Sequence, residues 1–378
     1  MSNEPAGVIE LIELVRVEIP LVRPFRTSFG TDTVRDALLV HVVTSAAEGW
    51  GECVADRAPL YSSEWVDGAA EVIERFLIPR VVDEPLADVE AVGSRLADVE
   101  GHPMAKGALE MALLDAQLRA QSMSLAAYFG AERTRVDCGV SIGIQDDTGA
   151  LLELVAEYLD AGYRRIKLKI EPDHDVAPVR AVREHFGADV ALQVDANAAY
   201  TRADGPTLAA LDPFGLLLIE QPLAPDDIVG HARLAREIRT PICLDESITS
   251  ARGAADAIEL GACSIVNIKA GRVGGYLEAR RVHDVCVARG VPVWCGGMLE
   301  TGLGRAANVA LAALPGFTLP GDTSASRRYF ERDLTEPFVL DDGTLTVPLG
   351  PGIGVTPLPD ALADFTTARR VVHRRSAR

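Results

Sequence analysis

The chain has 378 residues, of which 48% are hydrophobic and 24% charged, a balance that excludes a disordered or collagen-like protein. Thirty-seven Lys and Arg residues against 55 Asp and Glu residues give a net charge of −18. A field of that sign repels phosphate backbones and anionic lipids, so we expect neither nucleic acid nor a membrane surface as a partner.

Three features of the sequence bear on where the protein works. Four glutamates lie within the first 18 residues, whereas a secretory signal needs a basic start and an unbroken apolar run. No segment approaches the ~18 apolar residues of a membrane helix. The six cysteines are scattered, without a C-x-x-C pair. Because a chain of this length can bury a core without disulfides, we expect reduced thiols and a cytoplasmic location.

The first third of the chain mixes strand and helix patterns. Residues 8–22 alternate apolar and polar, and Ala37–Val43 is an apolar run, so both are predicted strands. The segment Gly49-Trp50-Gly51 is interpreted as a break after them. Apolar residues at helical spacing predict helices at Glu64–Phe76 and Met104–Gln121. Together these elements predict an α+β domain over residues 1–125.

From Val136 onward the pattern becomes a repeat of strand and helix. Short apolar runs occur at Val136–Ile142, Arg165–Ile170, Val190–Val194, Gly215–Ile219, Ile242–Leu244, Ser264–Ile268 and Val291–Trp294. Helical patterns between them include Ala150–Leu159, Val176–His185, Ile228–Ile238 and Gly275–Ala288. Seven or eight consecutive units favour a closed α/β barrel over an open sheet, so residues 126–320 are predicted to form a TIM-like barrel. No G-x-G-x-x-G opens a helix, which counts against a dinucleotide-binding fold.

After Pro320 the alternation ends. Phe338–Val347 is predicted to be a hairpin that turns at Asp341-Asp342-Gly343. We expect the segment 321–378 to return and pack on the first domain. Its basic end suggests either a binding arm or a frayed terminus, and the frayed terminus is favoured. The arginines concerned are Arg369, Arg370, Arg374, Arg375 and Arg378.

Ionisable residues stand at the carboxyl ends of successive predicted strands of the barrel. They are Lys167, Lys169, Asp195, Glu220, Asp245 and Lys269. From Lys169 onward each is 24 to 26 residues from the next, which is one strand–helix unit. In a barrel this is the end where active sites are built. A single strand-end carboxylate is usually a helix cap or a surface ion pair, but a run in consecutive register favours a functional site.

Three carboxylates on adjacent strands that converge on one point need a cation. All-oxygen ligation by Asp195, Glu220 and Asp245 favours a hard ion, Mg²⁺ first and Mn²⁺ second. None of the seven histidines ends one of these strands, which argues against a zinc hydrolase and against a histidine base. Glu246, next to Asp245, is expected to point away from the metal and to bond a neighbouring strand.

The order of these residues around the barrel predicts a mechanism. Lys169 and Lys269 flank the predicted metal from opposite sides, so the α-carbon of a bound carboxylate would lie between two amines. A metal stabilises the enediolate that forms when the α-proton leaves, and lysines whose pKa is lowered by crowding and burial can act as bases. Lys167 is expected to orient the substrate or to lower the pKa of its neighbour.

The constellation resembles the enolase superfamily, muconate-lactonizing subgroup. Further segments resemble the N-acylamino acid racemase/o-succinylbenzoate synthase family over about residues 8–360, among them PFRTSFG, GWGECV, PLYSSEW, GYRRIKLKIEP, LQVDANAAY, TPICLDES, GGMLETG and LPGDTSAS. The resemblance implies an α+β capping domain over a modified (β/α)7β barrel, with Asp195, Glu220 and Asp245 as Mg²⁺ ligands. It implies Lys169 and Lys269 as the bases of a 1,1-proton transfer.

The resemblance also assigns residues around the substrate. Lys167 and Asn197 match positions near the substrate carboxylate, and Ser141 and Met298 match positions that line its acyl side. Phe25 lies on a capping loop. In a second capping loop this chain carries Asp56 and Arg57, where relatives tend to have apolar or small residues. This charged pair either alters side-chain preference or points to solvent, and the sequence leaves both open.

The leading functional interpretation is a Mg²⁺-dependent racemase of N-succinyl or other N-acyl amino acids, with accompanying o-succinylbenzoate synthase activity. A dedicated o-succinylbenzoate synthase of menaquinone synthesis is the alternative, followed by a dipeptide epimerase or cycloisomerase. An aldolase-type Schiff base on Lys269 and a non-catalytic role are the options from other classes. The partner expected is a small-molecule carboxylate, and relatives imply a homo-oligomer.

Overall fold

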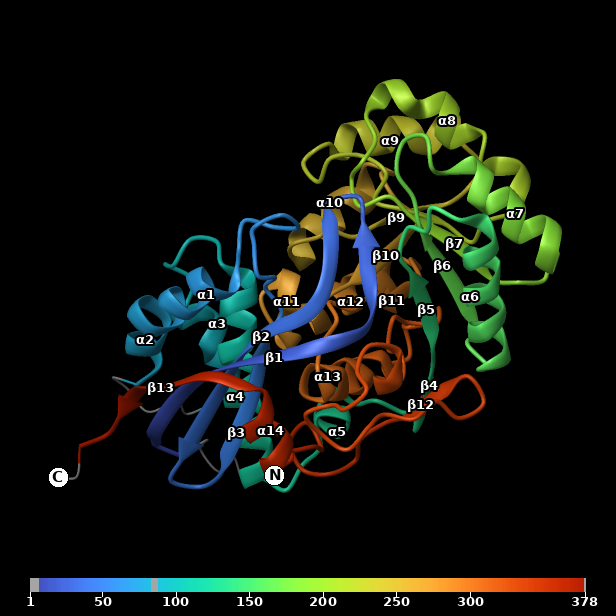
Figure 1. Cartoon of the computed structure of the whole chain (residues 1–378). Coiled ribbons are helices and arrows are strands. Elements are labelled where there is room, and N and C mark those ends of the chain that lie inside the picture. The colour runs from blue at the N-terminus through green and yellow to red at the C-terminus, as the bar shows by residue number, and fades with distance from the viewer. Residues whose placement is uncertain (1–6, 83–87, 377–378) are drawn as a thin grey trace.

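Two long strands, β1 (Ile9–Thr27) and β2 (Gly30–Thr44), form a hairpin that spans the N-terminal part of the protein (Figure 1). The computed structural model describes residues 7–82 and 88–376. The hairpin belongs to a four-stranded sheet with the order β13-β1-β2-β3. Its turn end reaches across to the barrel that the later strands form (Figure 1), so the tip can cover the barrel mouth.

The glycine-flanked segment predicted as a break is instead strand β3 (Glu48–Cys53), so that prediction is wrong. β3 packs on the helix α4 (Pro103–Ala120), which agrees with the predicted Met104–Gln121 helix. A Cβ atom at Gly49 or Gly51 would collide with the α4 backbone at Ala112 or Ala108. The glycines therefore permit close contact between strand and helix rather than ending the strand.

The other helices of this part come after β3 in the chain. They are α1 (Val66–Val72), a π-helical turn (Ile73–Leu77), α2 (Ile78–Val82), α3 (Val92–Arg95), α4 and α5 (Leu125–Phe129). The first three replace the predicted Glu64–Phe76 helix, which begins two residues later than expected. Glu64 is not helical because its carboxylate accepts hydrogen bonds from the backbone N–H groups of Met104 and Ala105, at 2.7 and 3.0 Å. These two donors would otherwise be unsatisfied at the start of α4.

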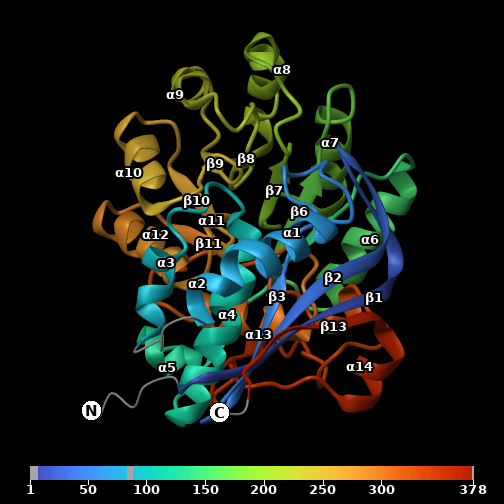
Figure 2. The same cartoon turned by 90° about the vertical axis from the view of Figure 1, so that its left-hand side faces the viewer.

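The predicted strand–helix repeat is confirmed as a curled sheet of seven parallel strands in chain order, β5 to β11. The strands are β5 (Gly139–Ile142), β6 (Arg165–Lys169), β7 (Leu192–Asp195), β8 (Ile219–Glu220), β9 (Ile242–Leu244), β10 (Ile265–Ile268) and β11 (Val293–Cys295). The helices outside them are α6 (Thr148–Asp160), α7 (Val176–Phe186), α8 (Gly205–Ala209), α9 (Ile228–Glu237), α10 (Ala251–Glu259), α11 (Ala270–Val273), α12 (Tyr276–Ala288) and α13 (Gly302–Ala312). Figure 2 shows the strands curling beneath the N-terminal elements.

The segment 317–322 lies between the two edges of this curled sheet. Phe317 forms a parallel bridge with Val293 of β11, and Gly321 forms one with Cys138, the residue before β5. The backbone N–H of Asp322 also donates to the carbonyl of Cys295, at 2.8 Å. This segment therefore occupies the place of an eighth strand and closes the ring between β11 and β5.

The C-terminal part departs from the prediction in two ways. The predicted turn forms and is closed by an antiparallel bridge between Asp341 and Thr344, but β12 (Thr344–Thr346) pairs along its length with β4 (Arg135–Asp137). The predicted frayed terminus is wrong for β13 (Thr366–Arg374), which follows α14 (Pro359–Phe365) and pairs antiparallel with β1. Its arginines bind carboxylates of the sheet and of the helix region, through the pairs Arg369–Glu13 and Arg370–Glu74. Arg378 lies outside the described residues.

Two buried glutamates from the N-terminal part hold barrel helices at their first turns. Glu52 of β3 accepts hydrogen bonds from the N–H groups of Thr301 (3.1 Å) and Gly304 (3.0 Å) at the start of α13. Glu110 of α4 accepts one from the N–H of Leu277, at 3.1 Å, at the start of α12. Both carboxylates satisfy orphan helix donors, and both fix the barrel against the rest of the chain.

All six cysteines are buried and form no disulfide in the part of the chain that the structure describes. Across the same residues, every helix is too short or too polar to pass through a lipid bilayer.

Candidate active site

A small cavity of about 50 Å³ lies where the β1–β2 hairpin meets the carboxyl ends of the barrel strands. We call its two faces the roof and the floor. The roof comes from the N-terminal part of the chain and consists of Phe25, Thr27, Phe29, Asp32, Asp56 and Tyr61. The floor comes from the barrel and consists of Ser141, Lys167, Lys169, Asn197, Lys269, Gly297, Met298, Leu299, Asp322 and Tyr329. All six predicted catalytic and substrate-binding residues therefore line one cavity.

Strand register explains how the ionisable side chains come together. Lys169 of β6 is paired in register with Asp195 of β7, which is paired with Glu220 of β8. Residues paired in register point to the same face of a sheet, so these three project inward side by side. Asp245 follows β9 and Lys269 follows β10, which continues the row around the barrel.

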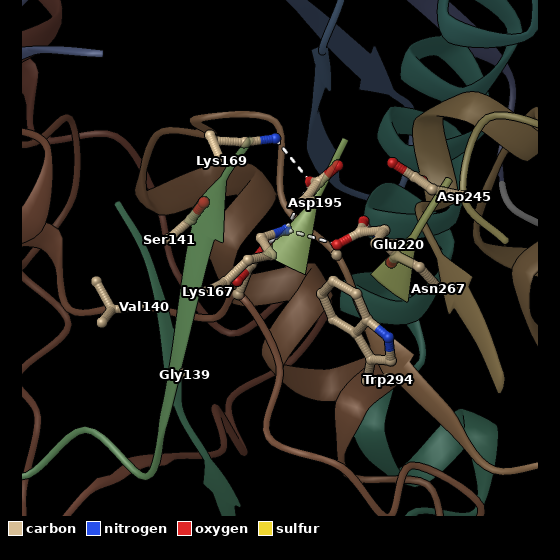
Figure 3. A network of polar contacts seen from close by, with 12 residues as sticks. Gly139, Val140, Ser141, Lys167, Lys169, Asp195, Glu220, Asp245, Asn267 and Trp294 are labelled. Atoms are coloured by element: carbon tan, nitrogen blue, oxygen red, sulfur yellow. Dashed lines mark hydrogen bonds and ion pairs between the residues drawn. The ribbon is translucent and has the colours of Figure 1, made fainter. Parts of the chain in front are cut away.

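Each of the three predicted metal ligands is bound by a cation of the protein, and Figure 3 shows the contacts of Asp195 and Glu220. The Asp195 carboxylate lies 2.7 Å from Lys169 Nζ, and the Glu220 carboxylate lies 3.1 Å from Lys167 Nζ. Asp245 lies 2.8 Å from Lys269 Nζ and is also bound by Arg272. Glu220 accepts a further hydrogen bond from Asn267 Nδ2, at 2.7 Å. All three carboxylates are at most 1% exposed, so these contacts form away from bulk water.

Adjacent carboxylates of the row differ in their electrostatics. Burial raises the pKa of Asp195, but the positive charges of Lys169 and Lys167 outweigh it and hold that pKa well below its usual range. Burial and the negative charge of Asp195 raise the pKa of Glu220. One carboxylate is thus strongly stabilised as an anion, while its neighbour lacks full compensation.

Lys167 is held by carboxylates on three sides. Its Nζ lies 2.6 Å from Asp322, 3.1 Å from Glu220 and 3.2 Å from Asp195, and 4.8 Å from the centre of the Trp294 ring. Burial lowers the pKa of Lys167, but the negative charges of Asp322, Glu220 and Asp195 raise it by a larger amount, so the net shift is upward. Its surroundings therefore hold Lys167 as a positive charge in the floor.

Lys269 bridges the barrel and the roof. Its Nζ donates to the Asp245 carboxylate at 2.8 Å and to the hydroxyl of Tyr61 at 3.0 Å. Burial lowers the pKa of Lys269, but Tyr61, Glu246 and Glu220 raise it by more. The expectation that crowding and burial lower the lysine pKa values is wrong for Lys167 and Lys269 in this arrangement. The physical reason is that carboxylates, rather than other cations, are their nearest neighbours.

Lys169 is positioned by two side chains at the carboxyl end of β7. Its Nζ donates to Asp195 at 2.7 Å and to Asn197 Oδ1 at 2.6 Å. Asn197 has a φ of 42°, a left-handed conformation that asparagine adopts more readily than most residues. Its Nδ2 donates to Glu246 Oε1, at 3.0 Å. Glu246 was expected to bond a neighbouring strand, whereas it reaches past β8 to the residue after β7, close to the ionisable row.

Carboxylate and amide oxygens at the carboxyl ends of the barrel strands are possible ligands for a metal ion. Three carboxylates on neighbouring strand ends suit a hard divalent cation. Two nearby buried oxygens, Asn267 Oδ1 and Glu246 Oε2, have no hydrogen-bond partner among the described residues, so the floor has unused acceptors. No group of three or more Asp, Glu, His or Cys side chains within residues 7–82 and 88–376 is close enough together to hold an ion. Asp195, Glu220 and Asp245 have the chemistry of metal ligands, but their ion pairs with the lysines would have to break before a metal could bind. This ligand set therefore stays a prediction.

Several residues of the cavity were not assigned a role from the sequence. Tyr61 lies in the PLYSSEW segment, and Arg272 is one helical turn beyond Lys269, so both had a local signal. Asp322, which accepts from Lys167 and Arg165, follows a segment without a strand-like apolar run. Asp32 sits in a polar stretch of β2 where only the hairpin geometry brings it to the roof.

The structure separates the two charged residues of the second capping loop. Asp56 lines the cavity, with a side chain 22% exposed. Arg57 points outward, with a side chain 63% exposed, and pairs with Glu18 at 3.1 Å and Asp36 at 3.5 Å. Asp56 thus faces the cavity and Arg57 lies at the surface, while an effect of Asp56 on side-chain preference stays a prediction.

Comparison with known proteins agrees with this geometry. Residues 11–130 match the mandelate racemase / muconate lactonizing enzyme N-terminal domain, and residues 150–361 match the enolase C-terminal domain-like family. The chain is 66% identical to an N-succinylamino acid racemase of Amycolatopsis sp over 358 residues, which cover 95% of this chain and 97% of that protein.

Two further relatives are less similar to this chain. An o-succinylbenzoate synthase of Geobacillus stearothermophilus is 48% identical over 368 residues, covering 97% of this chain and 98% of that protein. The crystal structure of a muconate lactonizing enzyme from Pseudomonas fluorescens, complexed with muconolactone, superposes with a TM-score of 0.90. It is 28% identical and covers 96% of this chain and 100% of that one.

Proposed function

The chain belongs to the mandelate racemase / muconate lactonizing enzyme branch of the enolase superfamily, and on that premise we propose that it racemises N-succinyl and other N-acyl amino acids by 1,1-proton transfer. The observation that carries the proposal is the pair Lys169 and Lys269. These amines lie at opposite ends of one row of carboxylates and line the same cavity. Racemisation needs a proton donor and a proton acceptor on opposite faces of one carbon, and two amines at the two ends of one row suit that task.

Members of this superfamily use a divalent metal. We propose that Asp195, Glu220 and Asp245 hold it, with Mg²⁺ preferred and Mn²⁺ as a substitute. When bound, the metal would stabilise the negative charge that develops on the substrate carboxylate as the α-proton leaves.

The remaining steps belong to side chains of this chain. One lysine amine removes the α-proton, and the ammonium group of the other returns a proton to the opposite face. Asn197 holds Lys169 at 2.6 Å, and the Tyr61 hydroxyl holds Lys269 at 3.0 Å, so both nitrogens are oriented before the substrate arrives. Lys167, with its fixed positive charge, attracts the substrate carboxylate.

Ser141 supports an acyl-binding role for the floor. Its Oγ is buried and has no hydrogen-bond partner among the described residues, yet the residue lines the cavity. A buried hydroxyl without a partner is costly unless something bonds it. An acyl carbonyl or amide of the substrate would supply that bond, and Met298 would provide an apolar contact beside it.

A dedicated o-succinylbenzoate synthase is the second candidate, favoured by the 48% identity to a protein of that name. The same residues would serve that dehydration. Lys169 would remove the proton and assist departure of the hydroxyl group, and Lys269 would stabilise the anionic intermediate by its charge.

The proposal is tested by incubating the protein with Mg²⁺ and a panel of N-succinyl-L-amino acids while optical rotation is recorded. Loss of rotation that EDTA abolishes would support the racemase. Conversion of only the hydroxy acid whose dehydration yields o-succinylbenzoate would support the synthase instead. Turnover of neither class would contradict both proposals. We also propose a cytoplasmic homo-oligomer, which size-exclusion chromatography with light scattering would test.

A further inference from the structure

The lining of the roof and the lining of the floor present charged groups of opposite sign to the cavity. The floor presents three ammonium groups, from Lys167, Lys169 and Lys269, and the carboxylate of Asp322. The carboxylates that bind these lysines, Asp195, Glu220 and Asp245, are not part of the lining. The roof contributes the carboxylates of Asp32 and Asp56, and these are the charged residues of the roof within the described ranges. A molecule that bridges the two faces is therefore favoured if it is anionic at one end and cationic at the other.

Asp56 is compensated only in part. Its Oδ1 lies 3.3 Å from Arg35 Nη1, and Arg35 is also 3.9 Å from the Glu52 carboxylate. Arg35 is itself 2% exposed and is not part of the cavity lining. The charges of Arg35 and Lys269 both lower the pKa of Asp56, but burial and the charge of Asp32 outweigh them, so the net shift is upward. Lys269 is also paired with Asp245.

Asp32 is less compensated still. Between residues 7–82 and 88–376, no hydrogen bond or ion pair involves its carboxylate, although the residue is only half exposed to solvent and lines the cavity. It is in register with Phe25 across the hairpin, so both side chains point to the same face. Burial raises the pKa of both Asp32 and Asp56, and the charge of Asp32 raises that of Asp56 further. A cation placed between them would relieve both costs.

We propose that Asp32 and Asp56 select N-acyl amino acids with a cationic side chain, of the lysine or arginine type. This inference rests on the proposed racemase function. The substrate carboxylate would face the floor, while the charged end of its side chain would meet the two roof carboxylates. Phe29 and Tyr61, whose ring centres are 5.6 Å apart in the roof, would pack against the aliphatic stem and offer their faces to the cation.

The test compares substrates of equal shape and different charge. N-succinyl-L-arginine is paired with N-succinyl-L-citrulline, and N-succinyl-L-lysine with N-succinyl-L-norleucine, and kcat/KM for racemisation is measured for each. The wild type is expected to favour the cationic member of each pair by roughly tenfold or more. Asp56→Asn and Asp32→Asn are each expected to reduce the ratio several-fold, and the double variant to bring it to about one. Asp56→Glu, which keeps the charge, is expected to retain the preference.

Asp67→Asn is the matched control, because it also removes one negative charge from the N-terminal part of the chain. Its side chain is 69% exposed and lies outside the cavity lining, so the ratio should not change. Thermal unfolding of each variant shows whether it is folded. A wild-type ratio near or below one, or a ratio that the double variant leaves unchanged, would overturn the inference while leaving the racemase proposal intact.

Binding separates this inference from the proposed function. Isothermal titration of the wild type and of Asp32→Asn/Asp56→Asn with the arginine and citrulline compounds gives a ratio of dissociation constants that needs no turnover. If no N-acyl amino acid is racemised but arginine still binds more tightly than citrulline, the proposed reaction fails and the selectivity stands. Equal dissociation constants for the two compounds in the wild type would overturn the selectivity.

Discussion

Some polar side chains of the site already have hydrogen-bond partners within the protein, whereas others have none among the described residues. Lys169 and Lys269 are each held by a carboxylate and by a polar partner from a different segment. Ser141 Oγ, by contrast, is buried without a partner in the described chain. The first group is preorganised for chemistry, whereas the second is free to bond a ligand.

Ser141→Ala separates binding from stability. Because the hydroxyl is unpaired in the protein, its removal should leave the free energy of unfolding unchanged or slightly higher. If the hydroxyl bonds the acyl group, KM for N-acyl substrates should rise roughly fivefold with little change in kcat. Denaturant titration and steady-state kinetics measure the two effects. A large loss of stability with unchanged KM would show that the hydroxyl serves the fold instead.

Asp322→Asn tests the charge compensation of the floor. Asp322 accepts from Lys167 Nζ at 2.6 Å and from Arg165 Nη2 at 2.9 Å, and all three residues are buried. Loss of one partner of a buried ion cluster should lower the free energy of unfolding by about 3 kcal/mol. Asp146→Asn, at a side chain 85% exposed and paired with Arg26, should change it by less than about 1 kcal/mol. Similar values for the two variants in urea titrations would contradict this account.

The strand-end rule found the lysines and carboxylates of the barrel row but neither Asp322 nor the residues of the roof. Lys169, Asp195 and Glu220 were predictable because a parallel strand places its last inward residue at a fixed position. Asp32 and Tyr61 come from a hairpin and a loop whose approach to the barrel depends on packing between distant segments. Asp322 was hidden because its segment closes the barrel by isolated bridges rather than as a regular apolar strand.

Among the elements, the apolar runs located the barrel strands well because buried parallel strands are short and continuously apolar. The same reasoning failed at β3, where Gly49 and Gly51 indicated a turn. Both glycines are needed because the α4 backbone lies against them. β12 failed for a related reason: local turn residues predict the turn, but the partner strand, β4, lies some 200 residues earlier in the chain.

Gly51→Ala tests this close contact. The added methyl group meets the α4 backbone at Ala108, so the variant should lose about 3 kcal/mol of unfolding free energy or fail to fold. Gly93→Ala is the control, since a Cβ there meets nothing within 4 Å and the residue lies in helix α3. Its effect should stay within about 1 kcal/mol, in the stabilising direction. Thermal unfolding monitored by circular dichroism would decide, and equal melting temperatures would contradict the argument.

Glu110→Gln tests the contact between α4 and α12. Burial raises the pKa of Glu110 to about 7, although the backbone N–H of Leu277 bonds the carboxylate. Since the unfolded group ionises near 4.5, the folded state binds the extra proton between pH 4.5 and 7. Stability therefore falls as pH rises through that window, by about 3 kcal/mol for the full shift.

The glutamine variant lacks this ionisation, so its stability should change less between pH 5 and pH 8 than that of the wild type. Urea titrations at both values measure the difference. Parallel pH profiles for the two proteins would show that Glu110 does not carry the effect.

The whole molecule brings two faces together that neither part forms alone. The barrel supplies a floor of lysines and carboxylates, and the β1–β2 hairpin with the loop around Tyr61 supplies the roof. Glu110 joins α4 to α12, and Glu52 joins β3 to α13. These two contacts fix the position of the barrel relative to the N-terminal part of the chain. On our proposals, selection of the substrate side chain falls to the roof, whereas acyl binding and proton transfer fall to the floor.

The central claim is that Lys169 and Lys269 act on opposite faces of one α-carbon. It is tested most directly by α-proton exchange in D₂O, followed by NMR, on separate enantiomers of one N-succinyl amino acid with the wild type, Lys169→Ala and Lys269→Ala. The account predicts that neither variant racemises, and that each still exchanges the α-proton of one enantiomer only, a different one for each variant. Racemisation by either variant, or exchange of both enantiomers by one lysine alone, would contradict it.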